Sequence, residues 1–264
     1  MPGFTAKDVQ KLRQLTGVGM LDAKRALEEN DGEMDTAVTW LRENGLASQA
    51  KRADREASEG AVAIGTADNV VAIVQLRSET DFVAKSDEFV LLVSELADLV
   101  AVKGVDAVDE RGDELDSMKL KLKENISLGQ VVRIEAPAGG AVDSYLHLQA
   151  GRGVNAVVVA VAGGNKVLAH DIAAHIAFAR PLYINRDAVP EAEVAAERET
   201  IEKIAHNEGK PEASLPKVVE GRLNGWFKER VLLDQSYVRD EKQSIAGMLG
   251  SARIVAFAQV FIGS

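Results

Sequence analysis

The residues best suited to functional chemistry lie on a short connector between two regular elements. Upstream, Val70–Leu76 is a β-branched and apolar run that is typical of a buried strand. Downstream, Ser86-Asp87-Glu88 is typical of a helix start, with an N-cap followed by an acidic first turn. Asp81 and Phe82 lie between them, on a segment that we expect to be an exposed loop.

A carboxylate beside a large aromatic ring on a connector supports two interpretations. In the first interpretation, the ring of Phe82 folds back under the following helix and anchors its own loop, as many loop aromatics do. Alternatively the ring is a wedge, meaning an exposed apolar side chain that inserts into a partner protein. The spacing of the residues leaves both interpretations open.

Other polar residues give no support for catalysis, metal binding or nucleotide binding. His170 and His175 are five residues apart, off the i, i+4 spacing that places two ligands on one helical face, and the chain has no cysteine. Neither a Ser-His-acid set nor a carboxylate pair can be assigned. Gly151–Ala156 matches a dinucleotide fingerprint only nominally, because valines continue a strand where a helix must begin. We therefore expect no enzymatic activity, no metal and no cofactor.

Composition excludes several further classes of protein. The chain has 264 residues, of which 46% are apolar and 27% charged, enough for two or three modest domains. A net charge of −10 argues against direct binding to nucleic acid, which requires clustered cations. The first residues contain no apolar signal core, and no run approaches the roughly 20 apolar residues that cross a bilayer. The absence of cysteine excludes disulfides. We expect a soluble, cytoplasmic protein without membrane contact.

Residues 1–46 predict a three-helix bundle similar to a ubiquitin-associated domain, a kind of bundle that usually binds other proteins. Thr5 and Asp8 predict a capping box at the first helix, and glycine turns separate the helices. The third helix is expected to stop at Asn44-Gly45. Met20, at the first turn, is either bundle core or a partner contact, because its flexible thioether adapts to partner surfaces.

Residues 47–59 are rich in charge and alanine and predict a solvated, partly helical linker. The cations of this linker are expected to be solvated. They are Lys51, Arg52 and Arg55.

The rest of the chain predicts two α+β units with antiparallel sheets, so the fold class is α+β. Residues 60–138 form the first unit, with a hairpin and a helix from Asp87 to about Val102. Residues 139–264 form the second, with strands near 142–148, 154–161 and 254–261. Its helix at 167–178 is expected to turn Val167, Ala174 and Phe178 toward the sheet.

A helical hairpin at about 190–228 is expected to protrude from the second unit. Its first helix is expected to turn four apolar residues inward, namely Val194, Ile201, Ile204 and Ala205. The sequence leaves open whether this hairpin stays free or pairs with a second copy to form a homodimer.

Several motifs, in order along nearly the whole chain, resemble the elongation factor Ts family. Thr80-Asp81-Phe82-Val83-Ala84-Lys85 looks like the family signature, and Leu12–Leu27 looks like its opening motif L-R-x-x-T-G-x-G-M-x-D-x-K-x-A-L. Ser144–His147 matches a family S-Y-x-H segment. Lys123–Ile126 resembles G-E-N-I/M, with lysine at the position where glycine is usual.

The resemblance implies a bacterial guanine-nucleotide exchange factor that binds elongation factor Tu and promotes GDP release. In such a protein the Asp81-Phe82 segment enters the partner's nucleotide-binding domain and disturbs its magnesium and phosphate site, and the N-terminal bundle packs on the same domain. The residues expected at the partner are Leu12, Arg13, Met20, Thr80, Asp81, Phe82, Val83 and His147. For His147, a strand histidine satisfied by its own fold is the alternative.

Two other functions stay open at this stage. One is a protein-binding adaptor that acts through the N-terminal bundle, with ubiquitin-like or other targets. The other is a metabolic enzyme with an unrecognised pocket.

Overall fold

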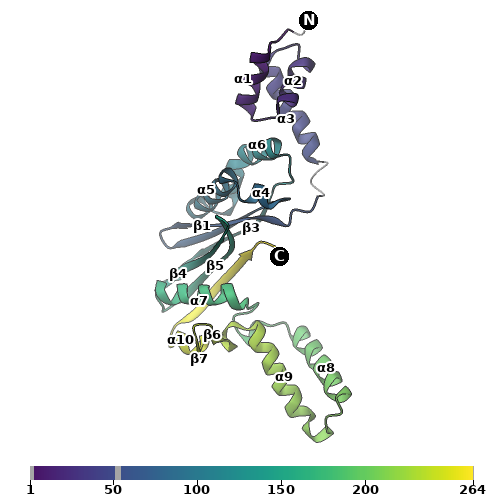
Figure 1. The fold of residues 1–264 in the computed structure, drawn as a ribbon. Helices are drawn as coiled ribbons and strands as arrows, with labels where there is room; N and C mark the ends of the chain where they lie inside the picture. Colours follow the sequence, from purple (N-terminus) through teal and green to yellow (C-terminus); the bar gives the residue numbers. More distant parts are fainter. Residues whose placement is uncertain (1–2, 51–54, 264) are drawn as a thin grey trace.

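The computed structural model describes residues 3–50 and 55–263, which form an elongated molecule with a small helical bundle at one end and a helical hairpin at the other (Figure 1). The N-terminal bundle comprises α1 (Ala6–Thr16), α2 (Met20–Glu29) and α3 (Met34–Ala50). The first sheet and its helices comprise β1 (Glu59–Ala67), β2 (Val70–Ser78), α4 (Asp81–Ala84), α5 (Asp87–Lys103), α6 (Gly112–Leu122) and β3 (Ser127–Glu135).

The remaining elements belong to the second sheet and the hairpin. They are β4 (Gly140–Gln149), β5 (Arg152–Ala162), α7 (Lys166–Ala179), α8 (Glu191–Asn207), α9 (Leu215–Arg230), β6 (Ser236–Tyr237), β7 (Asp240–Ser244), α10 (Ile245–Leu249) and β8 (Arg253–Phe261). Within residues 3–50 and 55–263, four short 3-10 helices connect these elements, at Val105–Arg111, Arg186–Ala188, Glu212–Ser214 and Leu232–Asp234.

Two three-stranded antiparallel sheets lie face to face at the centre of the molecule. The first sheet has the order β1-β2-β3 and the second β4-β5-β8. Apolar side chains of both sheets meet between them, among them Val71, Ile73, Val158 and Val260. Helix α5 covers the outer face of the first sheet and α7 that of the second, which gives four layers. The predicted α+β class with antiparallel sheets is confirmed.

The central strands β2 and β5 are buried on both faces. Along β2, Val71 and Ile73 face the second sheet while Ala72 and Val74 pack under α5. A strand covered on both sides has no solvent face, so its sequence is a continuous apolar run without alternation. The spacing could not indicate that the two sheets pack on each other, because that contact joins strands about eighty residues apart.

The third helix of the bundle is longer than predicted. It continues through Gly45 to Ala50, so the expected stop at Asn44-Gly45 is wrong. A Cβ at Gly45 would lie 1.7 Å from a methyl carbon of Leu120, which belongs to α6. The glycine therefore lets α3 lie directly against α6, and this packing outweighs the cost of a glycine within a helix.

Two ion pairs join the bundle to α6 and its C-terminus. The Arg42 guanidinium lies 2.5 Å from the Asp113 carboxylate, and the Lys123 ammonium lies 2.6 Å from the Asp22 carboxylate. Lys123 has a φ of 58°, a left-handed conformation that glycine adopts without strain and that explains why glycine is usual there in the resembling family.

The cations of the predicted linker have different outcomes. Lys51 and Arg52 lie outside the described residues. Arg55 lies inside them and is exposed as expected, with 55% of its side chain accessible. Its guanidinium is also 3.5 Å from the Glu79 carboxylate, and its carbonyl accepts a hydrogen bond from Asn125.

The expected inner face of α7 is also wrong. Val167 and Phe178 are 71% and 79% exposed, while the face toward the sheet carries Ala169, Ile172 and Ile176. Val167, Ala174 and Phe178 do share one helical face, but spacing alone cannot tell which of two apolar faces meets the sheet. His175 is buried and its Nε2 hydrogen-bonds with the side chain of Gln235 at 2.9 Å.

The protruding hairpin of α8 and α9 is present, and its two helices pack around a small core of their own (Figure 1). Ile201 lies in this core and Ala205 is buried, as expected, whereas Ile204 is exposed, so its predicted inward position is wrong.

Gly151 lies in a strand-to-strand turn and Gly153 within β5, so the nominal dinucleotide motif has the strand geometry that the sequence indicated.

We expect Gly153→Ala to destabilise the contact between the sheets. An ideal Cβ at Gly153 would lie 2.2 Å from the Val62 carbonyl oxygen of β1, so the two backbones must separate. Overpacking of this kind costs about 1–3 kcal/mol, measurable by urea unfolding. Gly221→Ala is the matched control: no heavy atom lies near that position in α9, so the change should stabilise by about 0.5–1 kcal/mol. Equal effects of the two changes would contradict the close approach.

Candidate partner-binding site

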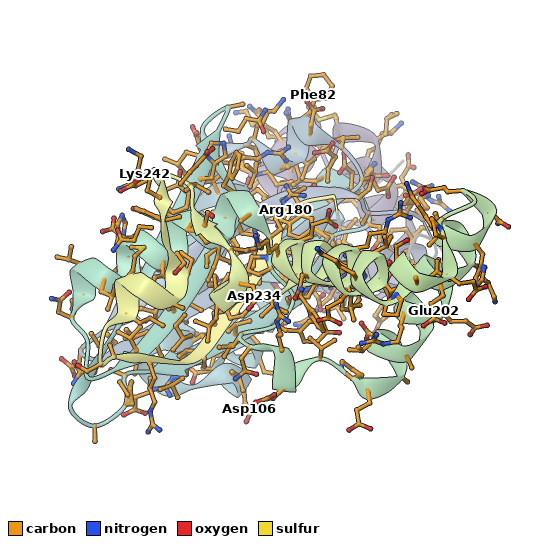
Figure 2. The ribbon with its side chains drawn as sticks, turned by 90° about the horizontal axis from the view of Figure 1, so that it is seen from below. Phe82, Asp106, Arg180, Glu202, Asp234 and Lys242 are labelled. Carbon is orange, nitrogen blue, oxygen red and sulfur yellow. The ribbon has the colours of Figure 1, made fainter. Side chains whose placement is uncertain are left out.

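The segment expected to be a loop contains one turn of helix, α4, and we call Thr80–Ala84 the α4 turn. Thr80 is its N-cap, and the Val83 N–H donates to the Thr80 hydroxyl at 3.4 Å. Val83 and Ala84 are buried in the core under α5. Phe82 points the opposite way and is 85% exposed. Figure 2 shows its ring projecting beyond the ribbon at the edge of the molecule.

The exposure of Phe82 decides between the two interpretations of its ring. The ring is not folded under α5, so the interpretation as a loop anchor is wrong. Val83 is the buried member of the pair and anchors the turn in its place, so the expectation that Val83 touches a partner is wrong. The α4 turn therefore offers one apolar side chain to solvent while its neighbours hold it to the core.

Glu124 fastens the base of the α4 turn. One of its carboxylate oxygens accepts hydrogen bonds from the backbone N–H groups of Glu79 and Thr80, both at 3.1 Å. The other accepts from the Thr80 hydroxyl. The Glu79 carboxylate in turn accepts from the Asn125 N–H at 2.6 Å. Hydrogen bonds to an ionised acceptor are stronger than neutral ones, so this segment is held firmly.

Sequence reasoning missed this role of Glu124. Its signal was present, because Glu124 belongs to the Lys123–Ile126 motif. Nothing in the spacing connects that motif with a turn some forty residues earlier.

Asp81 adds a negative charge beside the ring. Lys85 donates a hydrogen bond to its carboxylate at 2.5 Å and thereby lowers the pKa of Asp81, and the charges of Lys85 and Arg152 act in the same direction. Asp81 is therefore ionised at neutral pH. The turn presents an apolar ring and a carboxylate at the same surface.

The bundle places its three predicted contact residues differently. Leu12 is 0% exposed and lies in the bundle core, so the expectation that it touches a partner is wrong, because an amphipathic helix buries that face. Arg13 is exposed, and Met20 is 48% exposed, which rules out the interpretation of Met20 as bundle core. Leu15 and Leu21 are exposed as well, and we call Leu15, Met20 and Leu21 the bundle tip.

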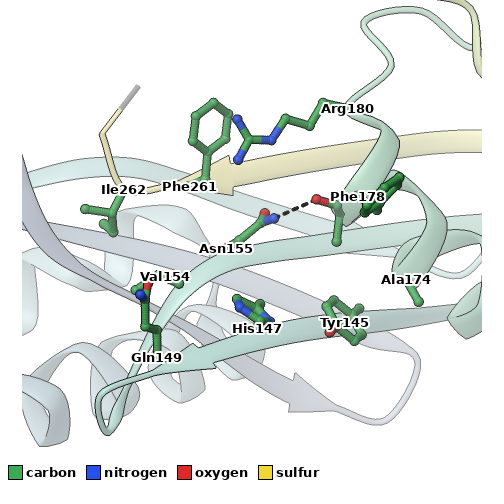
Figure 3. Close-up of a pocket in the computed structure, with 11 residues that line it drawn as sticks. Tyr145, His147, Gln149, Val154, Asn155, Ala174, Phe178, Arg180, Phe261 and Ile262 are labelled. Atoms are coloured by element: carbon green, nitrogen blue, oxygen red, sulfur yellow. Dashed lines mark hydrogen bonds between the residues drawn. The ribbon is translucent and has the colours of Figure 1, made fainter. Parts of the chain in front are cut away.

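His147 lies on β4 at the rim of an open pocket of about 600 Å³ (Figure 3). Tyr145 and Gln149 come from the same strand, while Phe178 and Arg180 come from the end of α7. The Arg180 guanidinium stacks 4.5 Å from the centre of the Phe261 ring. The pocket is a shallow, mixed apolar and cationic surface rather than an enclosed cavity.

No group of three or more metal-ligating side chains occurs in the part of the chain that the structure describes. Within the same ranges, none of the helices combines the length and the apolar composition needed to cross a membrane.

Comparisons with known proteins cover the whole chain. A family model described as "Elongation factor TS" matches residues 79–264. A protein named elongation factor Ts from Acidothermus cellulolyticus is 42% identical, with 100% of this chain and 99% of the relative aligned. Its namesake from Clavibacter michiganensis is 40% identical with 100% of both chains aligned. The protein of the same name from Mycobacterium avium is 41% identical, with 96% of this chain and 95% of the relative aligned.

We expect Glu124→Ala to loosen the α4 turn. The change leaves two part-buried N–H groups without their acceptor, which costs about 1–3 kcal/mol. Amide hydrogen exchange at Glu79 and Thr80 should accelerate. Glu88→Ala is the control, because it removes only a carboxylate paired with Lys121 at the surface, and such pairs contribute about 0–1 kcal/mol. Unchanged exchange at both amides in Glu124→Ala would show that the carboxylate does not hold the turn.

Proposed function

The chain belongs to the elongation factor Ts family, and we propose that it releases GDP from elongation factor Tu by inserting the Phe82 ring into that GTPase. Family membership places the protein in translation elongation. The observation that carries the proposal is an aromatic ring that is 85% exposed on a turn whose base is fixed by hydrogen bonds.

The proposed mechanism is thermodynamic linkage. An exchange factor binds the nucleotide-free form of its partner more tightly than the loaded form, so it weakens nucleotide binding by the same factor. Burying the ring of a phenylalanine contributes roughly 1.5–3 kcal/mol. If the pocket for the Phe82 ring opens only when the partner's magnesium and phosphate site is disturbed, that energy drives GDP release. No covalent bond forms or breaks in this chain.

The proposal assigns three separate surfaces to the partner. They are the bundle tip with Arg13, the α4 turn with Asp81 and Phe82, and the pocket rim with His147. Thr80 and Val83 contribute by holding the turn. Surfaces on one molecule that engage together bind far more tightly than each would alone, provided that their geometry allows simultaneous contact. The proposal includes no direct contact of this chain with nucleic acid, in keeping with its net charge of −10.

The ring of Phe82 gives the central test. Phe82→Ala should leave the melting temperature nearly unchanged, because the free protein does not bury the ring. It should slow the release of labelled GDP from elongation factor Tu by about tenfold or more, since each 1.4 kcal/mol is a factor of ten.

Val102→Ala is the matched control for Phe82→Ala. Val102 is also largely exposed, but it lies at the other end of α5. This control should leave both the stability and the release rate unchanged. A large fall in melting temperature for Phe82→Ala, with GDP release preserved per folded molecule, would refute the wedge.

The bundle tip should contribute affinity rather than exchange rate. Met20→Ala should raise the concentration of this protein needed for half-maximal GDP release by roughly three- to tenfold, as loss of one apolar contact of about 1 kcal/mol implies. The maximal rate should stay the same. Met34→Ala is the control, because Met34 is partly buried against the bundle core, so its truncation should lower the stability of the bundle instead. Unchanged affinity in Met20→Ala would favour the alternative in which the bundle acts as an adaptor for another protein.

A further inference from the structure

Arg152 stands out as a buried cation that joins the two sheets. It begins β5, directly after the turn from β4, and only 8% of it is exposed. Its guanidinium reaches across to β1 of the first sheet. One terminal nitrogen donates to the Gly60 carbonyl at 2.5 Å and the other to the Glu59 carboxylate at 2.7 Å. The Nε atom is buried without a hydrogen-bond partner among the described residues.

The two acceptors of Arg152 lie beside the strand that carries the α4 turn. Within the first sheet, Glu59 pairs with Ser78 and Gly60 pairs with Arg77. Ser78 is the last residue of β2, and its hydroxyl donates to the Thr80 carbonyl at 3.1 Å. Arg152 also contributes to the lowered pKa of Asp81, which places its charge near the turn.

The same arginine lies next to the His147 rim. Arg152 pairs with Gln149 at the end of the β4–β5 ladder, and His147 pairs with Asn155 a few residues further along it. Gln149 and Asn155 both line the pocket. Arg152 is therefore bonded to the strand that pairs with the last residues before the α4 turn. It is also built into the strand pair that carries the His147 rim.

We propose that Arg152 is a positioning residue that fixes the α4 turn relative to the His147 rim. The inference rests on the proposed function, because it concerns how two of the surfaces named there are presented together.

The physical reason lies in the kind of contact that each interaction makes. Apolar packing between the sheets is strong but non-directional, so on its own it allows the sheets to shift. The two hydrogen bonds of a planar guanidinium are directional and restrict that shift. Arg152 is buried while the side chain of Glu59 is 38% exposed, and ion pairs whether exposed or buried add little net stability. Replacing Arg152 should therefore change the relative position of the two sheets more than it changes the free energy of unfolding.

The first test measures the geometry in the free protein. The chain contains no cysteine, so Asp87→Cys on α5 and Val167→Cys on α7 accept one spin label each, on opposite sides of the sheet pair. We expect Arg152→Met to broaden the distribution of distances between the labels, measured by pulsed electron spin resonance. An unchanged distribution would overturn the proposal.

Arg133→Met is the matched control for the distance measurement. Arg133 also has a buried Nε without a partner among the described residues, and it donates to a backbone carbonyl, that of Ala101 on α5. This hydrogen bond joins β3 to α5, on the outer face of the first sheet, and does not reach the second sheet. This change should leave the distance distribution as narrow as in the unsubstituted protein.

The second test uses GDP release from elongation factor Tu. We expect Arg152→Met to lower the maximal release rate about tenfold, because a misplacement of about 1 Å has effects of at least this size on positioned groups. In the Phe82→Ala background the same change should cause no further loss, since Arg152 acts through the ring. In the Met20→Ala background Arg152→Met should lower the maximal release rate by the same factor as in the unsubstituted protein, as expected for independent sites.

A merely structural role predicts a different pattern. The fold-losses in maximal release rate caused by Arg152→Met and by Phe82→Ala would then multiply as well, and that result would overturn the proposal. If Arg152→Met does not fold, Glu59→Ala replaces it, because it removes one acceptor from a partly exposed side chain and should shift both readouts in the same direction.

The outcomes separate this inference from the proposed function. If the unsubstituted protein releases no GDP, the proposed function fails, and with it the role of Arg152 in exchange. If Phe82→Ala slows release while Arg152→Met does not, the function stands and the positioning role is wrong.

Discussion

The packing of two antiparallel sheets on each other is the constraint on which the rest of the molecule depends. It buries one face of β2 and β5, whose other faces lie under α5 and α7, and every proposed contact surface of the central body is attached to one of these strands. The α4 turn follows β2 directly, and His147 lies on the strand paired with β5. Because interiors are close-packed, a shift of one sheet would be transmitted to both surfaces.

An exposed aromatic ring requires support from its neighbours if it is to hold a fixed direction. At the α4 turn this support is divided between apolar and polar contacts. Val83 is buried under α5, and Glu124 accepts hydrogen bonds from the backbone at the entrance to the turn. A turn that is already ordered loses little conformational entropy on binding, which favours affinity at a given buried area.

The sequence predicts local elements well and long-range contacts poorly. The capping box at Thr5, the hairpin of β1 and β2, and the helix start at Ser86 all follow from residues a few positions apart. The roles of Glu124 and Gly45, and the contact of Arg152 with β1, depend on segments that meet only in the folded chain. The error on α7 has another source, because that helix is apolar on more than one face. An exposed Phe82 ring was one of two predicted arrangements, and it is the one found because Val83, not Phe82, packs under α5.

The α8–α9 hairpin has its own apolar cluster, which includes Leu223 and Phe227 and is separate from the clusters on the two sheets. Its stability is therefore largely uncoupled from that of the central body, so it should open as a distinct unit without disturbing the sheets. The turn between α8 and α9 contains Gly209 and lies at the end of the molecule opposite the N-terminal bundle (Figure 1), so it is a suitable place to insert a reporter domain.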